Sequence, residues 1–270
     1  MEHLPNFDDA EIETGNDFVK DRRFVTALAR GLDVLRCFKP GDTGLGNLEI
    51  ARRTGIPKPT ISRLTFTLTQ LGYLRYDDQH GFYRLGPGVL SLGYAMLSGL
   101  NIRERARPLM QELANRLDAT IAIGNRDQTQ AVYLEVCRGP GAVMLRIDVG
   151  HRNPIAPTAM GRALLSIMSG QERERCMAQV AREMDDSAEF ARLSKAVENA
   201  VNDVAERGYC LSLGDWQTDV NAVGVPLVDY DQNVYSLICG GPAFKLSRAY
   251  LEDQCGPQLV ALARKIPAIA

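Results

Sequence analysis

The side chains that could do chemistry in this sequence are not arranged for catalysis. The three histidines, His3, His80 and His151, lie far apart, and the six cysteines include no CxxC pair. Zinc sites and thiol enzymes need such close groups, and the P-loop, the GxSxG turn and the GxGxxG loop are also missing from the sequence. We therefore expect no enzyme, no metal site and no cofactor, and we expect most cysteines to be small buried residues.

Residues 58–71 instead carry side chains that are suited to reading DNA. A helix over this segment places Ile61, Leu64, Leu68 and Leu71 on one side, which we expect to be its core face. Its exposed face and flanks then hold Lys58, Pro59, Thr60, Ser62, Arg63 and Phe66. Arginine binds guanine edges in the major groove, and an exposed phenyl ring can contact thymine methyl groups. The alternative for this ring is packing on the hairpin that follows or on a dimer partner.

Two shorter helices must position this segment. Apolar residues at helical spacing predict a helix over residues 25–38 with a core face of Val25, Leu28, Leu32 and Leu35. Asn47 is a candidate N-cap for a helix over residues 48–54, which ends at Gly55. The buried residues of that helix are expected to be Leu48, Ile50 and Ala51. Helices joined by a tight turn that contains glycine form a helix-turn-helix.

A β-hairpin is expected directly after the DNA-reading helix. Residues 73–76 and 82–85 alternate like strands, and a polar turn cluster separates them. A hairpin in this position is the wing of a winged helix-turn-helix. Arg75 and Arg84 would then lie within reach of phosphates or of the minor groove. His80, at the tip, is interpreted as a turn residue.

The distribution of charge supports a DNA-binding segment. Residues 20–84 have a net charge of +6 and the whole chain has −2, while residues 1–19 hold six acidic side chains and no basic ones. A basic segment on a near-neutral chain indicates a negatively charged partner such as a double-stranded DNA operator. The acidic start lacks the apolar run of a signal peptide, and no stretch of about 18 apolar residues could cross a membrane. We expect a cytoplasmic protein with no membrane partner.

Residues 89–98 are almost wholly apolar and are predicted to form a helix. Such a helix has to be buried, and beside a small DNA-binding domain its partner is a second subunit. We therefore expect a homodimer or a dimer of dimers. A helix over residues 102–117 follows, in which Pro108 predicts a kink or two shorter helices. The expected parts are an acidic, disordered tail (1–20), a winged helix-turn-helix (21–85), a helical linker (86–101) and an effector-binding domain (102–270).

The C-terminal part combines strands with helices. Strands are expected over residues 120–124, 130–137, 142–149, 209–213, 222–228 and 234–239. Helices are expected over residues 158–170, 171–184, 187–207 and 247–265, and a loop over residues 153–157. Strands before and after a helical middle indicate an α+β domain with an antiparallel sheet.

Five segments, in this order, resemble the IclR-type transcription regulators, and the resemblance extends from about Val25 to Ala263. They are ARGLDVLRCF, LEIARRTGIPKPTISRLTFTLTQLGYL, PIAPTAMGRALL, RGYCLSLGD and AVGVPLVDYDQNVYSLICGGP. The resemblance implies a DNA-binding dimer, often a dimer of dimers. It also implies a C-terminal GAF-like α/β domain that binds a small metabolite.

The resemblance further implies an effector pocket between the sheet and the helix that starts at Thr158. Its residues, carried over to matching positions, are Met144, Thr158, Ala159, Met160, Gly161, Ser212, Asp215, Val220, Ala222, Cys239 and Gly241. Ordinary core packing is the alternative for Met144, Val220 and Ala222. From the sequence itself we add Arg146 and Trp216, with His151 nearby, and a surface or structural role is the alternative for these three.

These residues lead to an expected function. A helix N-terminus and Arg146 favour an anion, while Trp216 and the glycines after Cys239 leave room for a ring. We expect a sequence-specific transcription regulator that a small organic acid controls, an aromatic carboxylate above all, with repression rather than activation as its output. The alternatives are a thiol-redox regulator acting through Cys137 or Cys239, and an architectural DNA-binding protein without a ligand.

Overall fold

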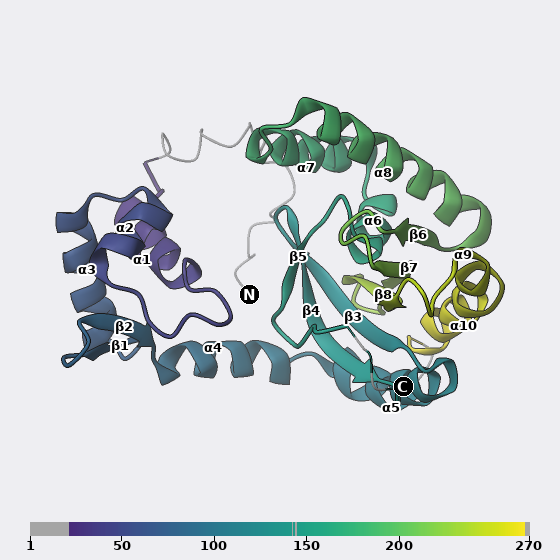
Figure 1. Cartoon of the computed structure of the whole chain (residues 1–270), viewed down its shortest axis with the longest axis horizontal. Helices are drawn as coiled ribbons and strands as arrows, with labels where there is room; N and C mark the ends of the chain where they lie inside the picture. Colours follow the sequence, from purple (N-terminus) through teal and green to yellow (C-terminus); the bar gives the residue numbers. More distant parts are fainter. Residues whose placement is uncertain (1–21, 142, 144, 268–270) are drawn as a thin grey trace, which may run out of the picture. The chain divides into compact units, whose positions relative to one another are not determined.

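A computed structural model describes residues 22–141, 143 and 145–267 of the chain (Figure 1). The contacts divide the chain into two compact units, Met1–Gly99 and Leu100–Ala270. The expected acidic tail (residues 1–20) and the expected pocket residue Met144 lie outside the described residues.

The first unit combines three helices with a two-stranded hairpin and ends in a further helix. In chain order its elements are α1 (Thr26–Arg36), α2 (Asn47–Thr54), α3 (Lys58–Gln70), β1 (Leu74–Asp77), β2 (Phe82–Leu85) and α4 (Pro87–Ser98). The two strands pair antiparallel. The turn from α2 to α3 begins at Gly55, whose φ of 68° is a left-handed conformation that suits glycine. This arrangement is the expected winged helix-turn-helix.

The core of this unit is narrower on α1 than expected. It is formed by Val34, Leu45, Ile50, Ile56, Ile61 and Leu74. On α1, the expected core residues Val25, Leu28 and Leu32 are exposed, and Leu35 is only partly buried. The small bundle covers only the side of α1 that carries Val34. Most of the expected apolar stripe therefore faces outward.

Two further leucines that we expect in the core are exposed, Leu48 on α2 and Leu71 after α3. Leu48 lies two residues before the buried Ile50, which is about 200° around the helix axis and therefore on the opposite side. Leu71 follows the last helical residue of α3, and its side chain no longer points to the same side as that of Ile61. The expected burial is wrong at both positions.

The second unit contains one six-stranded antiparallel sheet in the order β5-β4-β3-β8-β7-β6. The strands are β3 (Thr120–Asp127), β4 (Gln130–Arg138), β5 (Arg152–Pro154), β6 (Cys210–Leu213), β7 (Val220–Val228) and β8 (Val234–Pro242). The helices are α5 (Asn101–Leu117), α6 (Ala159–Ser166), α7 (Gly170–Glu183), α8 (Ser187–Arg207), α9 (Arg248–Tyr250), a π-helix (Leu251–Cys255) and α10 (Gly256–Lys265). The expected α+β class with an antiparallel sheet is confirmed.

Different helices cover the two faces of this sheet. α6 packs on one face, where Met160 joins a buried cluster with Tyr133, Ile147 and Ile238. α5 and α10 pack on the opposite face (Figure 1). Because side chains alternate along a strand, neighbouring residues of β8 point toward different helices.

Some local expectations for this unit are wrong. The expected strand over residues 142–149 does not form, since the described residues in that range lie in a loop. The edge of β4 pairs instead with β5, a strand that overlaps the start of the expected loop 153–157 and pairs with Gln130–Val132. The helix expected over residues 247–265 is divided by the π-helix, whereas α5 continues through Pro108 without a division.

Candidate functional site

The exposed face of α3 is the candidate DNA-binding surface. Lys58, Pro59, Ser62 and Arg63 are exposed, and Thr60 is half-buried. Phe66 is 65% exposed, so the hairpin does not bury its ring, and packing on a dimer partner stays the alternative to DNA contact. Within the described residues, Lys58 and Arg63 take part in no ion pair. Both cations are therefore free to meet phosphates or base edges.

Polar contacts fix α3 against α2. Asn47 is not the N-cap of α2, a position that Gly46 holds, and its side chain instead reaches α3. Its amide donates to Ser62 Oγ at 3.3 Å, and its carbonyl oxygen accepts a hydrogen bond from Thr65 Oγ1 at 3.2 Å. Thr65 is fully buried. These bonds hold the exposed face of α3 in one orientation.

Arg53 joins α2 to the segment that follows α1. Its guanidinium donates to Asp42 Oδ2 and to Glu49 Oε1 at 2.7 Å each, and to the carbonyl oxygen of Cys37 at 3.0 Å. Hydrogen bonds from Arg52 and Arg53 lower the pKa of Glu49 to about 2. Arg53 is thus occupied within the fold and is not available to DNA.

The hairpin places two arginines side by side. Arg75 and Arg84 are paired across β1 and β2, so their side chains share one face. Arg84 lies 4.9 Å from the centre of the Phe82 ring and 3.7 Å from Asp77. His80 is a turn residue, as expected, with Nδ1 3.0 Å from Asp77 Oδ1. The wing therefore adds positive charge beside α3.

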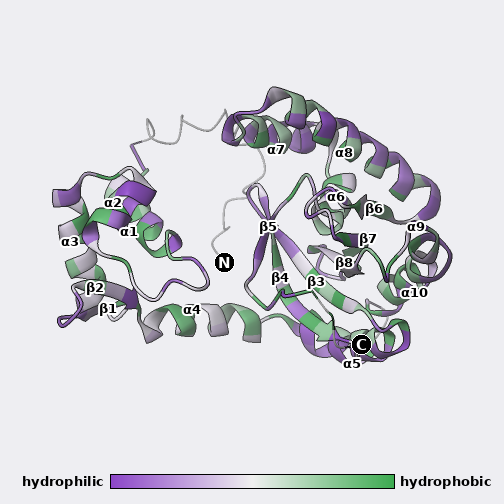
Figure 2. Cartoon of the chain, viewed as in Figure 1, coloured by the Kyte–Doolittle hydropathy of each residue, from purple (hydrophilic) through white to green (hydrophobic). Residues whose placement is uncertain are grey.

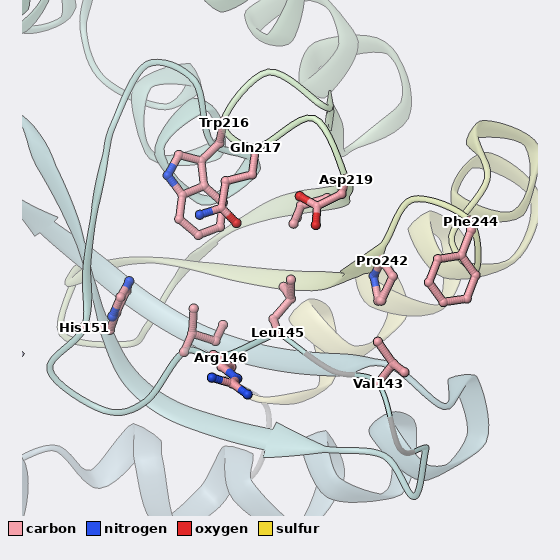
Figure 3. Close-up of a pocket in the computed structure, with 11 residues that line it drawn as sticks. Val143, Leu145, Arg146, His151, Trp216, Gln217, Asp219, Pro242 and Phe244 are labelled. Carbon is pink, nitrogen blue, oxygen red and sulfur yellow. The ribbon is translucent and has the colours of Figure 1, made fainter. Parts of the chain in front are cut away.

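A cavity of about 480 Å³ in the second unit is the candidate effector site. Figure 3 shows Trp216, Gln217 and Asp219 on one side of it and Leu145, Arg146 and His151 on the other. Its remaining lining residues are Val143, Ile147, Val220, Pro242 and Phe244. A smaller hollow shares Leu145, Trp216 and Val220 with this cavity and is called its inner extension below. It is lined by Tyr133, Leu145, Thr158, Ala159, Met160, Ser212, Trp216, Val220, Ala222 and Ile238. The volume suits a small organic molecule.

Eight of the expected effector residues line this cavity or its extension: Arg146, Thr158, Ala159, Met160, Ser212, Trp216, Val220 and Ala222. Thr158 and Ser212 already use their hydroxyl groups within the fold. Thr158 Oγ1 caps α6 by accepting from Gly161 N and donates to the carbonyl oxygen of Pro154. Ser212 Oγ donates to the carbonyl oxygen of Pro157 at 2.7 Å. Both side chains shape the cavity wall more than they offer free donors.

Four expected effector residues are not among the lining residues: Gly161, Asp215, Cys239 and Gly241. On β8, alternation directs Ile238 and Pro242 to the cavity, and Cys239 to the opposite face, where it meets Cys255. Gly161 packs against the backbone of Ile155, and a side chain at Gly241 would point at Leu246. Asp215 binds two arginines.

Several cavity residues were not predicted from the sequence, above all Tyr133, Gln217, Asp219 and Phe244. Phe244 is 80% exposed at the cavity rim, and no periodic pattern marks it because it lies in a turn. Asp219 puts a carboxylate opposite Arg146, so the cavity presents both signs of charge (Figure 3). The period-two pattern of β8 could have selected Ile238 and Pro242.

The cysteines do not favour the redox alternative. Five are buried and Cys37 is partly buried. Burial raises the pKa of the Cys137 thiol, and a hydrogen bond with Cys255 together with burial raises the pKa of Cys239. A reactive cysteine needs a lowered pKa and access to solvent. Neither Cys137 nor Cys239 combines these properties.

The described residues hold neither a cluster of metal-ligating side chains nor a membrane-spanning helix. No group of three or more His, Cys, Asp or Glu side chains in that part of the chain is placed to hold a metal ion. No described helix is both long enough and apolar enough to span a membrane.

Comparisons with known proteins match both units. Residues 27–78 match the IclR helix-turn-helix domain, and residues 94–268 match the family described as bacterial transcriptional regulator IclR C-terminal. The HTH-type transcriptional regulator TsaQ1/TsaQ2 of Comamonas testosteroni is 34% identical over 247 residues, which cover 90% of this chain and 88% of that protein. The Pca regulon regulatory protein of Pseudomonas putida is 26% identical over 254 residues, which cover 92% of this chain and 85% of that protein.

Solved structures give the same assignment. An IclR family transcriptional regulator from Brucella abortus is 46% identical with a TM-score of 0.85, covering 96% of this chain and 97% of that one. An IclR homologue from Microbacterium hydrocarbonoxydans, complexed with 4-hydroxybenzoate, shares the fold at 21% identity, with a TM-score of 0.65 and coverage of 90% and 96%. The matched families and relatives are transcription regulators and not enzymes. The chain belongs to the IclR family of DNA-binding bacterial transcription regulators.

Proposed function

We propose that this regulator binds a specific operator as a homodimer or a dimer of dimers and represses transcription there. The exposed face of α3 is the observation that carries the proposal. It combines Lys58 and Arg63, which form no ion pair among the described residues, with the exposed ring of Phe66. Arg75 and Arg84 of the wing would bind phosphates or enter the minor groove.

We further propose that a small organic acid, preferably an aromatic monocarboxylate, binds the cavity and changes operator affinity. Arg146 and His151 on one side favour a carboxylate, and Trp216 offers a surface for a ring. Asp219 across the cavity disfavours a second negative charge and could accept a hydrogen bond from a hydroxyl group. The 4-hydroxybenzoate bound by the Microbacterium homologue has this combination of groups.

Operator binding by an Arg63→Ala variant tests the DNA-binding surface. The substitution is expected to weaken binding by about 1–3 kcal/mol and to relax the preference at one base pair, because one bidentate contact to a guanine is lost. Fluorescence anisotropy would measure affinity for a duplex selected from a random library by the wild-type protein. Repeated at several salt concentrations, the wild-type titration is expected to give a log–log slope of about −5 or steeper.

Arg116→Ala is the matched control, because Arg116 is an exposed arginine of α5 in the second unit. It is expected to bind the operator like the wild type. Equal losses from both variants would mean that general charge, and not readout by α3, determines affinity. Binding that does not depend on salt would contradict the phosphate contacts.

An Ala222→Phe variant tests the effector cavity. Ala222 is half-buried and lines the inner extension, so a phenyl group there is expected to fill the extension and close it to the effector. The wild type should respond to an aromatic acid, found by thermal shift, with a change in operator affinity of about 1–3 kcal/mol. The variant should lose this response and keep its operator affinity without the acid. Ala205→Phe, on the exposed side of α8, is the control and should respond normally.

A further inference from the structure

A buried arginine on α6 links the segments that surround the effector cavity. Arg162 is 3% exposed, and its Nε donates to the carbonyl oxygen of Ala156 at 2.9 Å. Its Nη1 donates to the carbonyl oxygen of Leu211 at 2.9 Å and to Asp215 Oδ2 at 2.8 Å. Arg162 thus ties the segment before α6, the strand β6 and the loop after β6 to one guanidinium.

Asp215 is also held from the outside by α8. Arg192 Nη1 donates to Asp215 Oδ1 at 2.5 Å, and the same guanidinium binds Glu189 through two further hydrogen bonds of 2.8 Å each. Burial opposes ionisation of Asp215, but the hydrogen bonds and charges of Arg162 and Arg192 outweigh burial and lower the pKa of this carboxyl below its ordinary value. The carboxylate is therefore ionised and occupied by two arginines from different helices.

Asp215 directly precedes Trp216, whose ring is a wall shared by two cavities. One is the effector cavity, and the other is a hollow of about 370 Å³ below α7 and α8. Asp215 lines the second hollow and not the effector cavity, whereas Trp216 lines both. Backbone hydrogen bonds also hold this loop, from Gly214 N to Val220 O across its base and from Ala243 N to Asp219 O near its far end. Asp215 is the side-chain anchor at the Trp216 end.

We propose that Arg162 and Arg192 act through Asp215 as positioning residues that hold Trp216 as the wall between the two cavities. The helix α8 then controls the shape of the effector cavity, because half of the anchor comes from Arg192. Asp215 is a positioning residue in this arrangement and does not contact the effector. The inference rests on the proposed function only in its use of the effector cavity, since the position of Trp216 can be measured without effector or DNA.

Acrylamide quenching of Trp216 fluorescence tests this proposal on the full-length protein. Trp216 is the only tryptophan, so the emission reports this side chain alone. Asp215→Asn is expected to raise the Stern–Volmer constant at least about twofold, because the loop gains freedom and opens the ring to solvent. Arg192→Gln should raise the Stern–Volmer constant by a smaller amount. Arg192→Lys and Asp215→Glu, which keep the charge, should each raise it less than Arg192→Gln and Asp215→Asn do.

Glu198→Gln is the control, because it removes an ion pair with Lys195 on the same helix at an exposed position. It should leave the quenching of Trp216 unchanged. Circular dichroism and the thermal midpoint of each variant identify a general loss of structure. If Asp215→Asn does not fold, the quenching of Arg192→Gln tests the proposal, because Arg192 is half exposed and its replacement should leave the fold intact. Folded Asp215→Asn and Arg192→Gln proteins that quench like the wild type would overturn the proposal. Operator binding plays no part in this measurement, so a failure of the proposed function would not be mistaken for a failure of the anchor.

Discussion

Replacing by lysine the pair of α4 residues that faces a partner subunit, either Leu90 and Tyr94 or Leu92 and Met96, is expected to give monomers and to weaken operator binding by about a hundredfold or more. No residue of α4 is buried within the described chain, although the helix is apolar along its length (Figure 2). Leu90 is 74% exposed and Tyr94 is 70% exposed. Burying one such side chain contributes about 1.5–3 kcal/mol, so a helix of this composition is stable only against a partner.

The two pairs of substitutions lie on different sides of α4, since residues two apart are about 200° apart on a helix. The pair that faces the partner should break the assembly, and a dimer of dimers would be sensitive to both. Operator affinity should fall with the assembly, because a dimer binds two half-sites and the second binding event is then intramolecular. Light scattering at micromolar concentration and anisotropy on the same samples would measure both effects.

Glu198→Lys on α8 is the control for added charge, and it should remain assembled. Two dimeric double variants with wild-type operator affinity would contradict an interface on α4. The exposed residues Phe24 and Val25 before α1, and Leu28 and Leu32 on it, would then be the next surface to substitute.

Strong periodic patterns of apolar residues in the sequence were sufficient to predict much of the fold. The spacing of Ile61, Leu64 and Leu68 predicted which side of α3 packs inward, and the exposure of Arg63 and Phe66 follows from that phase. Patterns were insufficient where burial depends on partners far away in the chain. Whether Leu28 is covered depends on which helices surround α1, and the sequence of α1 does not contain that information.

The candidate effector site shows the same limit. Most of its strands and helices were predictable, although β5 was not, and the directions of single side chains were not. A register shift between Ile123 and Gly124 lets Tyr133 join the cluster around Met160 while Glu135 binds Arg103 and Arg107 of α5. Asp215 has partners 53 and 23 residues away, so only the folded chain shows that two arginines occupy its carboxylate.

Gly161→Ala is expected to lower the free energy of unfolding by about 3 kcal/mol, although replacing glycine by alanine inside a helix usually raises it by up to about 1 kcal/mol. A Cβ at Gly161 would lie 1.9 Å from the carbonyl oxygen of Ile155 and 2.5 Å from its Cα. That backbone cannot easily retreat, because Ile155 is fully buried and its N–H donates to the carbonyl oxygen of Thr129. A backbone clash of this depth costs more than the gain in helix propensity.

Gly170→Ala is the matched comparison in the same unit. Gly170 is the first residue of α7, and nothing lies within 4 Å of the position that its Cβ would take. Urea unfolding followed by circular dichroism should therefore show Gly170→Ala as neutral or slightly stabilised and Gly161→Ala as strongly destabilised. The comparison also separates two roles for Gly161. If Gly161→Ala kept its stability and lost only the response to an aromatic acid, Gly161 would contact the effector. The close approach to Ile155 would then not be what requires glycine there.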